Sequence, residues 1–458
     1  MPRVLEFTVP AEYEEKKVRE FLRNGAEVSA RLLRALKTQP NGIRRNGNPV
    51  RTVDLLHTGD RLQLTLPDET EHGTRVLLPL PLDVLYEDDD LLVVNKPAGL
   101  AMHETHNHQG DALSNAVAYY LQQHGKAGVF RTVGRLDKGT SGAVLCALNK
   151  YGAAKLAGHI EKEYLAVAGG VYAGRGTIDA PIYRPDPNKT LRAAGQHGEA
   201  AVTNWEALWS DGHISLLRVR PLTGRTHQIR VHFASLGTPL VGDDMYGSRD
   251  TRLTHQALHC ARIRFAHPVT GEVLDITAPT PADMAALFPN VRTDIYIREA
   301  KDSDCGALAR LKNRMWQDTY RGIYPDEKLD RFDEETHARK FHDLLTKRQV
   351  RLFVAETGGE LIAYMSCGAP QRPFGNFTQE IGLLYVRKDY QGQGLGRRLF
   401  SLGKTEIAAS GARDFFVSCN LYNLPARGFY EKMGGVLAGA FLDENDKSNA
   451  QAKYVYRI

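Results

Sequence analysis

Two breaks in the pattern of apolar residues constrain the fold most, because they divide the chain into three segments. Residues 67–79 are polar and flanked by proline, as expected of a linker. Near residues 286–294 an apolar pattern ends and the strand-like run IYIREA begins. The 458 residues also exceed the ~100–200 that one ordinary core contains. We therefore expect three domains, at residues 1–66, 80–285 and 293–458.

The composition is that of a soluble globular protein, with 42% hydrophobic and 25% charged residues. No apolar run approaches the ~18 residues of a membrane span, and the N-terminus lacks the basic start and apolar stretch of a signal peptide. These features predict a cytoplasmic protein without a membrane partner. Five scattered cysteines without a C-x-x-C pair indicate neither a disulfide framework nor a zinc ribbon: Cys146, Cys260, Cys305, Cys367 and Cys419.

The first segment has the pattern of two short helices followed by a hairpin. Apolar residues recur at three-to-four spacing after Val18 and again after Leu32, and Ser29 is placed to cap the second helix. Asn46-Gly47 favours a tight turn, and Leu62, Leu64 and Leu66 then alternate with polar residues as in a half-buried strand. The segment therefore predicts a compact helix-helix-hairpin module.

This module resembles the small RNA-binding domain first known from a ribosomal small-subunit protein. Its 12 Lys and Arg residues exceed its 8 Asp and Glu residues, which suits a polyanionic partner. The resemblance implies a phosphate-binding face formed by Arg31, Arg34, Lys37, Arg44 and Arg45. The alternative is a solvated basic face with no ligand.

In the middle segment, VGRLDKGTSGAVLCALN at residues 133–149 places Asp137 between two basic residues. A Gly-Thr-Ser-Gly turn and an apolar strand follow, so the aspartate is expected on a loop at the edge of a strand. A carboxylate in such a position can act as a nucleophile that attacks an intermediate and then leaves again. Such chemistry requires neither a metal nor an organic cofactor. The alternative is a structural loop aspartate paired with Arg135 or Lys138.

The run GRLDKGTSG resembles the motif of the RluA-type RNA pseudouridine synthases, which isomerise uridine to pseudouridine. Gly134 departs from the family, which more often has histidine there. Four further blocks, at residues 86–99, 162–170, 218–247 and 258–272, match the family in the same order. The resemblance implies that Asp137 is the nucleophile and that Arg135 enters the RNA in place of the flipped base. It also implies that Tyr164 contacts the base and that Arg225 pairs with Asp137, while we expect Arg220 and Arg230 to contact phosphates.

Three histidines, His103, His106 and His108, lie in the run AMHETHNHQGD. Their spacing lacks the helical placement and the cysteine partners of common zinc sites. We therefore expect a loop beside the active site and no metal.

The third segment predicts consecutive strands, a Gly-rich turn and a long amphipathic helix. In the run QGQGLG the glycines leave backbone N–H groups free at the start of the helix, where they can hold a diphosphate. This run and the block NLYNLPARGFYEKMGG resemble the GNAT family of N-acetyltransferases, which use acetyl-CoA as a cosubstrate. The resemblance implies coenzyme contacts by Val386, Gln391, Gly392, Gln393, Gly394, Leu395, Gly396, Arg397 and Asn423.

The same resemblance implies that Tyr430 is the acid that protonates the leaving thiolate. Glu380, on the strand before the Gly-rich turn, is the candidate base through a water molecule. The acceptor amine cannot be identified, because acceptor pockets in that family are built from variable loops.

Together these patterns predict an α+β multidomain protein. It has a small helix-helix-hairpin RNA-binding domain, a mixed β-sheet pseudouridine synthase domain with flanking helices, and a GNAT α/β domain. Ribosomal RNA is the preferred substrate and transfer RNA the alternative. A different function remains open, that of a ribosome-assembly factor that docks RNA and whose third domain only binds coenzyme or partners. The sequence leaves the oligomeric state open.

Overall fold

The computed structural model describes residues 3–67, 76–104, 109–126, 129–347, 350–443 and 446–458. The chain divides into two compact units. One comprises residues 1–169, 178–203 and 218–287, and the other comprises residues 170–177, 204–217 and 288–458. Among the described residues, no helix has the length and apolar character needed to span a bilayer.

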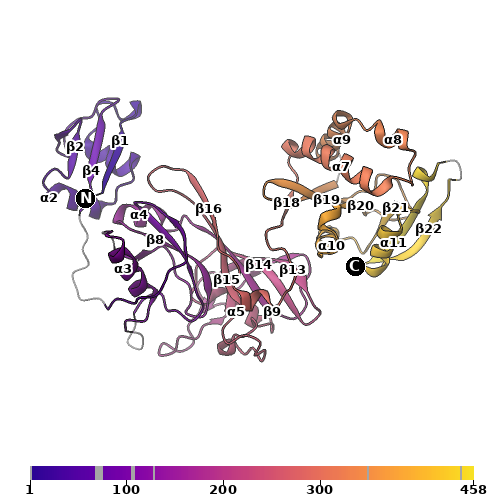
Figure 1. The fold of residues 1–458 in the computed structure, drawn as a ribbon, viewed down its shortest axis with the longest axis horizontal. Coiled ribbons are helices and arrows are strands. Elements are labelled where there is room, and N and C mark those ends of the chain that lie inside the picture. Colours follow the sequence, from indigo (N-terminus) through magenta and orange to yellow (C-terminus); the bar gives the residue numbers. More distant parts are fainter. Residues whose placement is uncertain (1–2, 68–75, 105–108, 127–128, 348–349, 444–445) are drawn as a thin grey trace. The chain divides into compact units, whose positions relative to one another are not determined.

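The first part of the first unit is a small module with its own sheet, in the strand order β1-β4-β2-β3. Two helices, joined through a π-helical turn at Phe21–Gly25, precede its hairpin (Figure 1). The elements are β1 (Val4–Thr8), α1 (Val18–Glu20), α2 (Ala30–Thr38), β2 (Ile43–Arg45), β3 (Asn48–Pro49) and β4 (Arg61–Thr65).

The local signals of this module are confirmed. The Ser29 side chain accepts a hydrogen bond from Leu32 N at 3.2 Å and caps α2. Asn46 and Gly47 both have positive φ, at 50° and 85°, as a tight hairpin turn requires. The strand β1 was not predicted. It pairs antiparallel with β4, so its partner lies more than fifty residues away and no local pattern indicates it.

The module packs against the part of the unit that follows it. Tyr151, a buried residue of α4 (Lys150–Leu156), donates a hydrogen bond to Ala26 O at 3.0 Å. Its ring lies edge-on to Phe7 at 6.1 Å between centroids. Arg3 donates to both oxygens of the buried Asp90, at 3.0 and 2.6 Å. The two parts therefore share apolar and polar contacts.

The main sheet follows the order β10-β13-β14-β9-β15-β8-β6-β5, with β16 paired to β15 and β7 to β8. The sheet is mixed, since β15 and β8 run parallel while β15 and β9 run antiparallel. Its strands are β5 (Val84–Glu87), β6 (Leu91–Lys96), β7 (Arg131–Thr132), β8 (Ser141–Ala147), β9 (Glu161–Gly169), β10 (Arg175–Asp179), β13 (Val202–Ser210), β14 (Ile214–Pro221), β15 (Leu258–Ala266) and β16 (Val273–Thr277). The other elements of this region are α3 (Leu113–Gln123), α5 (Gln228–Ser235), α6 (Ala282–Ala285) and the hairpin of β11 (Ile182–Tyr183) and β12 (Ala193–Ala194).

The buried strand β8 follows the Asp137 motif directly and fixes where that motif lies. All seven of its residues are buried, as expected of a strand covered on both faces. Gly142 has φ of 112°, and a Cβ there would lie 2.3 Å from Cys260 O in the neighbouring strand β15. Only glycine permits β8 and β15 to approach this closely, so the second glycine of Gly-Thr-Ser-Gly is explained by packing.

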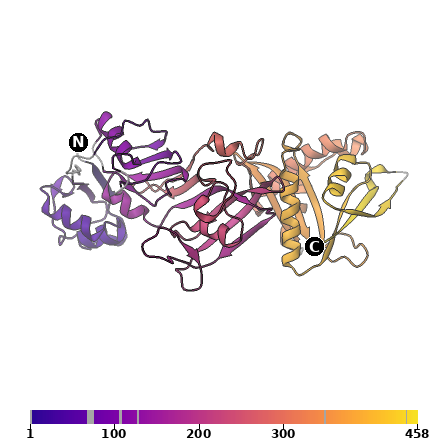
Figure 2. The same ribbon diagram turned by 90° about the horizontal axis from the view of Figure 1, so that it is seen from below.

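The second unit contains a sheet in the order β17-β18-β19-β20-β21-β23-β22. Helices α7 and α9 pack on one face through a core that includes Leu308, Phe341 and Tyr364, and α10 and α11 pack on the other face. Figure 2 shows α10, in gold, lying along the strands. The elements are β17 (Tyr296–Glu299), α7 (Cys305–Tyr320), α8 (Asp326–Asp330), α9 (Glu334–Lys347), β18 (Val350–Thr357), β19 (Glu360–Gly368), β20 (Glu380–Val386), α10 (Leu395–Ala409), β21 (Asp414–Asn420), α11 (Leu424–Lys432), β22 (Val436–Phe441) and β23 (Gln451–Arg457).

Strands β20 and β21 separate soon after they meet. They run parallel, and their pairing consists of Glu380 with Phe416 and Ile381 with Val417. Beyond Ile381, the described residues provide no strand on this side of β20. A strand edge is therefore open beside the Gly-rich turn, and its backbone groups can bind an extended ligand.

Candidate active sites

A tight turn after Leu136 presents Asp137 just before the start of β8, an interior strand of the main sheet. Thr140 N donates to Asp137 O at 3.0 Å and closes the turn. Lys138 O accepts hydrogen bonds from Gly99 N at 2.9 Å and from Lys96 Nζ at 3.1 Å. The turn that carries Asp137 is thus held by the Lys-Pro-Ala-Gly turn some forty residues upstream.

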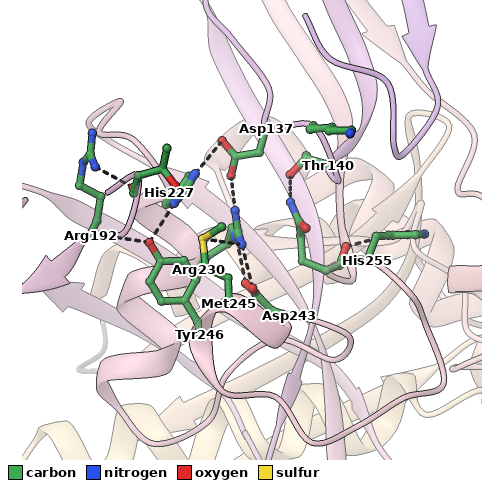
Figure 3. A network of polar contacts seen from close by, with 12 residues as sticks. Asp137, Thr140, Arg192, His227, Arg230, Asp243, Met245, Tyr246 and His255 are labelled. Carbon is green, nitrogen blue, oxygen red and sulfur yellow. Dashed lines mark hydrogen bonds and ion pairs between the residues drawn. The ribbon is translucent and has the colours of Figure 1, made fainter. Parts of the chain in front are cut away.

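The Asp137 carboxylate is bound by Arg230, as Figure 3 shows. Arg230 Nη1 lies 3.2 Å from Oδ2 of Asp137, and the Nε and Nη2 of Arg230 bind the buried Asp243 at 2.7 and 2.8 Å. Burial opposes the charge of Arg230, but Asp243 and Asp137 outweigh it and raise its pKa above the ordinary value. Arg230 therefore stays charged and places a positive group beside the carboxylate of Asp137.

Arg225, the expected partner of Asp137, pairs with a different carboxylate. Its exposed side chain binds Glu199 at 2.5 Å and donates to Ala200 O at 3.1 Å. Arg230, which we expected to contact phosphates, takes the place beside the carboxylate. The difference arises because α5 begins at Gln228, which puts Arg230 inside the helix and leaves Arg225 in the loop before it.

Asp137, Arg135 and Tyr164 line one cavity of about 400 Å³, together with Arg225, Arg230 and His227. Tyr164, on β9, is 7% exposed, and burial raises its pKa well above the ordinary value, with smaller contributions from Cys260 and Asp137. Its hydroxyl therefore keeps its proton at neutral pH. Arg135 is exposed, as a side chain that enters RNA requires. Their roles toward a base stay predictions.

The sequence did not single out Lys96, although the motif that contains it was recognised. Lys96 is fully buried, and its Nζ donates to the carbonyl oxygens of Pro97, Leu100 and Lys138 at 2.9, 2.9 and 3.1 Å. Burial lowers its pKa to about 7, and the charge of Asp137 opposes this change. Lys96 thus joins two turns, one of which carries Asp137.

The other expected RNA contacts lie at several places. Arg31, Arg34 and Lys37 are exposed on α2. Arg44 is half-buried in β2, and Arg45 lies 3.7 Å from Asp60. Arg220 binds Glu163 at 2.6 Å. The phosphate-binding role of these residues stays a prediction.

Potential metal ligands approach one another at one place among the described residues. Asp88, Asp90 and His267 offer atoms within 4.8 Å, but Asp90 is occupied by Arg3 and by Asn149 Nδ2 at 2.7 Å. Asp90 is thus held by protein groups, and His267 Nε2 lies 2.9 Å from Asp88 Oδ2. Of the histidines in residues 103–108, His103 lies 3.2 Å from Thr132 Oγ1, while His106 and His108 fall outside the described residues.

The Gly-rich turn of the second unit has the conformation that the motif predicts. Gly392 and Gly394 have φ of 75° and 81°, and Gly394 is the N-cap of the 15-residue helix α10. The first turn of this helix follows directly after Gly394, and Arg397 is exposed in it. This arrangement suits a diphosphate at a helix N-terminus. Gln391 and Gln393 bind the backbone oxygens of Val386 and Asp389 and so shape the turn.

The two proposed acid–base residues of this unit are buried. Burial raises the pKa of Tyr430 well above its ordinary value, with smaller contributions from Cys419, Tyr385 and Glu380. Burial also raises the pKa of Glu380, which accepts hydrogen bonds from Gln371 N and Ser418 Oγ at 3.2 Å each. The side chain of Glu380 is 8% exposed, so it is not a solvated surface carboxylate.

Asn423 is the N-cap of α11. Its side chain accepts from Ala426 N at 3.1 Å. The coenzyme contact that the motif implies for Asn423 stays a prediction.

Two regions of the chain match families of enzymes. Residues 90–235 match the family described as RNA pseudouridylate synthase, and residues 313–435 match the acetyltransferase (GNAT) family. An RNA pseudouridine synthase of Bacillus subtilis, YhcT, is 39% identical over 253 residues, which cover 54% of this chain and 83% of the relative. Ribosomal large subunit pseudouridine synthase D of Haemophilus influenzae is 35% identical over 269 residues, with coverage of 54% and 81%.

Two solved structures resemble different parts of the chain. Human RNA pseudouridylate synthase domain containing 1 covers 46% of this chain and 87% of its own, with 29% identity and a TM-score of 0.37. The PaiA N-acetyltransferase of Thermoplasma acidophilum, solved with coenzyme A, covers 36% and 99%, with 18% identity and a TM-score of 0.30. The chain belongs to the RNA pseudouridine synthase family, and a GNAT acetyltransferase domain follows its pseudouridine synthase domain.

Proposed function

We propose that Asp137 is the nucleophile that isomerises uridine to pseudouridine in RNA. The reaction breaks the bond between uracil N1 and the ribose, turns the base over and forms a bond from uracil C5 to the same ribose carbon. Asp137 adds to the sugar or base intermediate and leaves again, so no group is consumed. The observation that carries the proposal is the Asp137 carboxylate held by Arg230 in a cavity beside Tyr164.

The neighbouring residues supply the remaining functions. Arg230 holds the Asp137 carboxylate in place, and Tyr164 contacts the uracil with its face and hydroxyl. Arg135 fills the space that the flipped nucleotide leaves in the RNA. Arg31, Arg34 and Lys37, on the exposed face of α2, hold phosphates at a distance from the reacting base.

The test is Asp137→Asn, which keeps the shape of the side chain and removes its charge. We expect no pseudouridine on an RNA that the unaltered enzyme modifies, with RNA affinity retained. Asp89→Asn, an exposed aspartate on the same unit, is the matched control and should retain activity. Full modification by Asp137→Asn would refute the assignment and favour a factor that docks RNA without altering it.

We further propose that the substrate is ribosomal RNA, and that the enzyme meets it in the cytoplasm. The support is the Haemophilus influenzae relative, which is named a ribosomal large subunit pseudouridine synthase. Pseudouridine mapping of total RNA, in cells that lack this protein and in cells that carry Asp137→Asn, should show the same lost position in ribosomal RNA. A position lost only from transfer RNA would assign the enzyme to that substrate.

For the second unit we propose transfer of an acetyl group from acetyl-CoA to an amine. The Gly392–Gly396 turn holds the diphosphate, and the open edge of β20 holds the coenzyme arm. The amine nitrogen bonds to the acetyl carbon, the carbon–sulfur bond breaks, and Tyr430 gives its proton to the thiolate. The proton of the amine passes through water to Glu380, whose raised pKa suits a base near neutrality.

Two variants separate binding from chemistry in this unit. Tyr430→Phe should bind acetyl-CoA with unchanged affinity in calorimetry and release free thiol more slowly when mixed primary amines are added. Tyr422→Phe, an exposed tyrosine, is the matched control. An unaltered chain that shows no heat of acetyl-CoA binding would contradict acetyl transfer and leave a docking module.

A further inference from the structure

His227 lines the same cavity as Arg230 and lies near the other oxygen of the Asp137 carboxylate (Figure 3). Its Nε2 is 4.0 Å from Oδ1 of Asp137, whereas Arg230 binds Oδ2. The opposite ring nitrogen, Nδ1, lies 2.8 Å from Tyr246 Oη. The imidazole thus bridges the nucleophile and a tyrosine that no role above involves.

The contacts of Tyr246 determine which ring nitrogen carries the proton. Tyr246 Oη accepts a hydrogen bond from Arg192 N at 3.0 Å, and its own single proton points to Nδ1 of His227. The other tautomer would leave this hydroxyl proton without an acceptor among the contacts of the described residues. Nδ1 is therefore the acceptor, and Nε2 carries the hydrogen that faces Asp137.

The backbone of His227 is held in an unusual conformation that aims the ring. Its φ is 59° and its ψ is 18°, a left-handed conformation that is strained for a residue other than glycine. Gln228 clamps the turn by accepting from Arg225 N at 3.0 Å and donating to Val202 O at 3.0 Å. The Tyr246 ring meets the imidazole edge-on at 5.7 Å.

Burial, together with the neighbouring cations, keeps the imidazole ring of His227 neutral. Burial lowers the pKa of His227, and the cations Arg230 and Arg192 add to this change, while the anions Asp137 and Asp243 oppose it. At neutral pH the ring is therefore uncharged, with one N–H directed at the carboxylate. An imidazolium would instead form an ion pair with Asp137 and lower its nucleophilicity.

We propose that His227 is a positioning residue for Asp137, fixed in its active tautomer by Tyr246. In the substrate complex Nε2–H donates to Oδ1 while Arg230 donates to Oδ2, and this fixes the plane of the carboxylate. Two donors leave lone pairs free on both oxygens for the reaction. Hydrogen bonds of this kind are often long before substrate binds and shorten in the complex. The inference rests on the proposed role of Asp137 as nucleophile.

Three variants test this role. The amide nitrogen of His227→Gln can reach the place of Nε2, whereas that of His227→Asn reaches only the place of Nδ1, and asparagine tolerates the left-handed backbone. In single-turnover pseudouridine formation at neutral pH, we expect His227→Asn and Tyr246→Phe to lose about 10-fold or more, and His227→Gln to lose less. RNA affinity should stay within about 2-fold of the unaltered enzyme in all three.

The pH profile separates positioning from a merely structural role. The rate of the unaltered enzyme should fall in acid, below the ordinary histidine pKa of ~6.5, because His227 becomes charged. In His227→Gln this acid limb should move to lower pH. His213→Gln and Tyr120→Phe, on exposed or remote positions, are matched controls that should keep the full rate and the limb. Circular dichroism melting confirms that each variant is folded.

The outcomes distinguish this inference from the proposed function. If Asp137→Asn is inactive while His227→Asn and Tyr246→Phe keep the full rate and an unchanged acid limb, the positioning role is overturned and the nucleophile stands. Equal losses in folded His227→Gln and His227→Asn, with the acid limb unmoved, also overturn it. If Asp137→Asn is active, the proposed function fails.

Discussion

Asp243 binds Arg230 through two hydrogen bonds of 2.7 and 2.8 Å, and this leaves Nη1 of Arg230 to bind Asp137 at 3.2 Å. A guanidinium is planar, so fixing one edge on Asp243 also fixes the direction of the remaining nitrogen. The side chain of Asp243 is fully buried and that of Arg230 is 6% exposed. The position of the Arg230 guanidinium beside Asp137 is therefore fixed by Asp243, which is not among the residues that line the cavity.

Arg230 and Arg225 should differ strongly when they are replaced. Arg230→Lys keeps the charge but cannot bind Asp243 and Asp137 together, so kcat should fall about 100-fold or more. Arg225→Ala should leave kcat within about 3-fold, because Arg225 binds Glu199 and not the nucleophile. Steady-state kinetics on one RNA measures both. A larger loss of kcat from Arg225→Ala than from Arg230→Lys would restore Arg225 as the partner.

Asp243→Asn should destabilise the first unit. It leaves the buried guanidinium of Arg230 with one carboxylate in place of two, and breaking a buried pair costs about 3–5 kcal/mol. Hydrogen exchange of amides in β9 and β15 reports this loss. Asp250→Asn also breaks an arginine pair, but an exposed one with Arg252, and should change protection by less than about 1 kcal/mol.

Lys96→Met should change how stability depends on pH. The pKa of Lys96 is lowered from 10.5 to about 7 in the folded state, so between these values the unfolded chain binds the extra proton. Folding stability therefore gains from Lys96 as the pH rises from about 7 toward 10.5. In Lys96→Met this rise should be absent when denaturation is measured across that range. An identical pH dependence in the variant would show that Lys96 keeps an ordinary pKa.

Two adjacent arginines in the GNAT domain should give opposite results. Arg397 is exposed at the start of α10, so Arg397→Ala should weaken acetyl-CoA binding about 5-fold at low salt and leave the melting temperature unchanged. Arg398 is buried and donates to Ile295 O at 3.2 Å, so Arg398→Ala should lower the melting temperature. Calorimetry at two salt concentrations and thermal melting separate these effects.

Motifs with short spacing predicted the parts of the site that are local in sequence. The placement of Asp137 on a turn before a buried strand followed from GRLDKGTSG and the apolar run after it. The run QGQGLG likewise predicted a turn before a helix, and Gly392 and Gly394 have positive φ in that turn. In both cases the backbone conformation depends on a few consecutive residues, which a sequence displays directly.

The partners of Asp137 could not be predicted in the same way. The left-handed backbone at His227 interrupts the chain just before α5, so spacing within TGRTHQIR does not indicate which arginine faces the carboxylate. Asp243 and Tyr246 reach the site from one segment and Lys96 from another, and both segments are far from Asp137 in sequence. Only the paired strands and the turns they fix bring these side chains together.

The shared contacts between the N-terminal module and the region after it have a consequence for deletion experiments. Removing residues 1–66 would take Phe7 and Ala26 O away from the buried Tyr151 and leave Asp90 without Arg3. Such a shortened chain would lose packing and an ion pair near β6 and β8, the strands that hold the turn of the nucleophile. A loss of activity in the shortened chain would then report lost stability as much as lost RNA binding. Charge-reversing substitutions on the exposed face of α2 would test RNA binding alone.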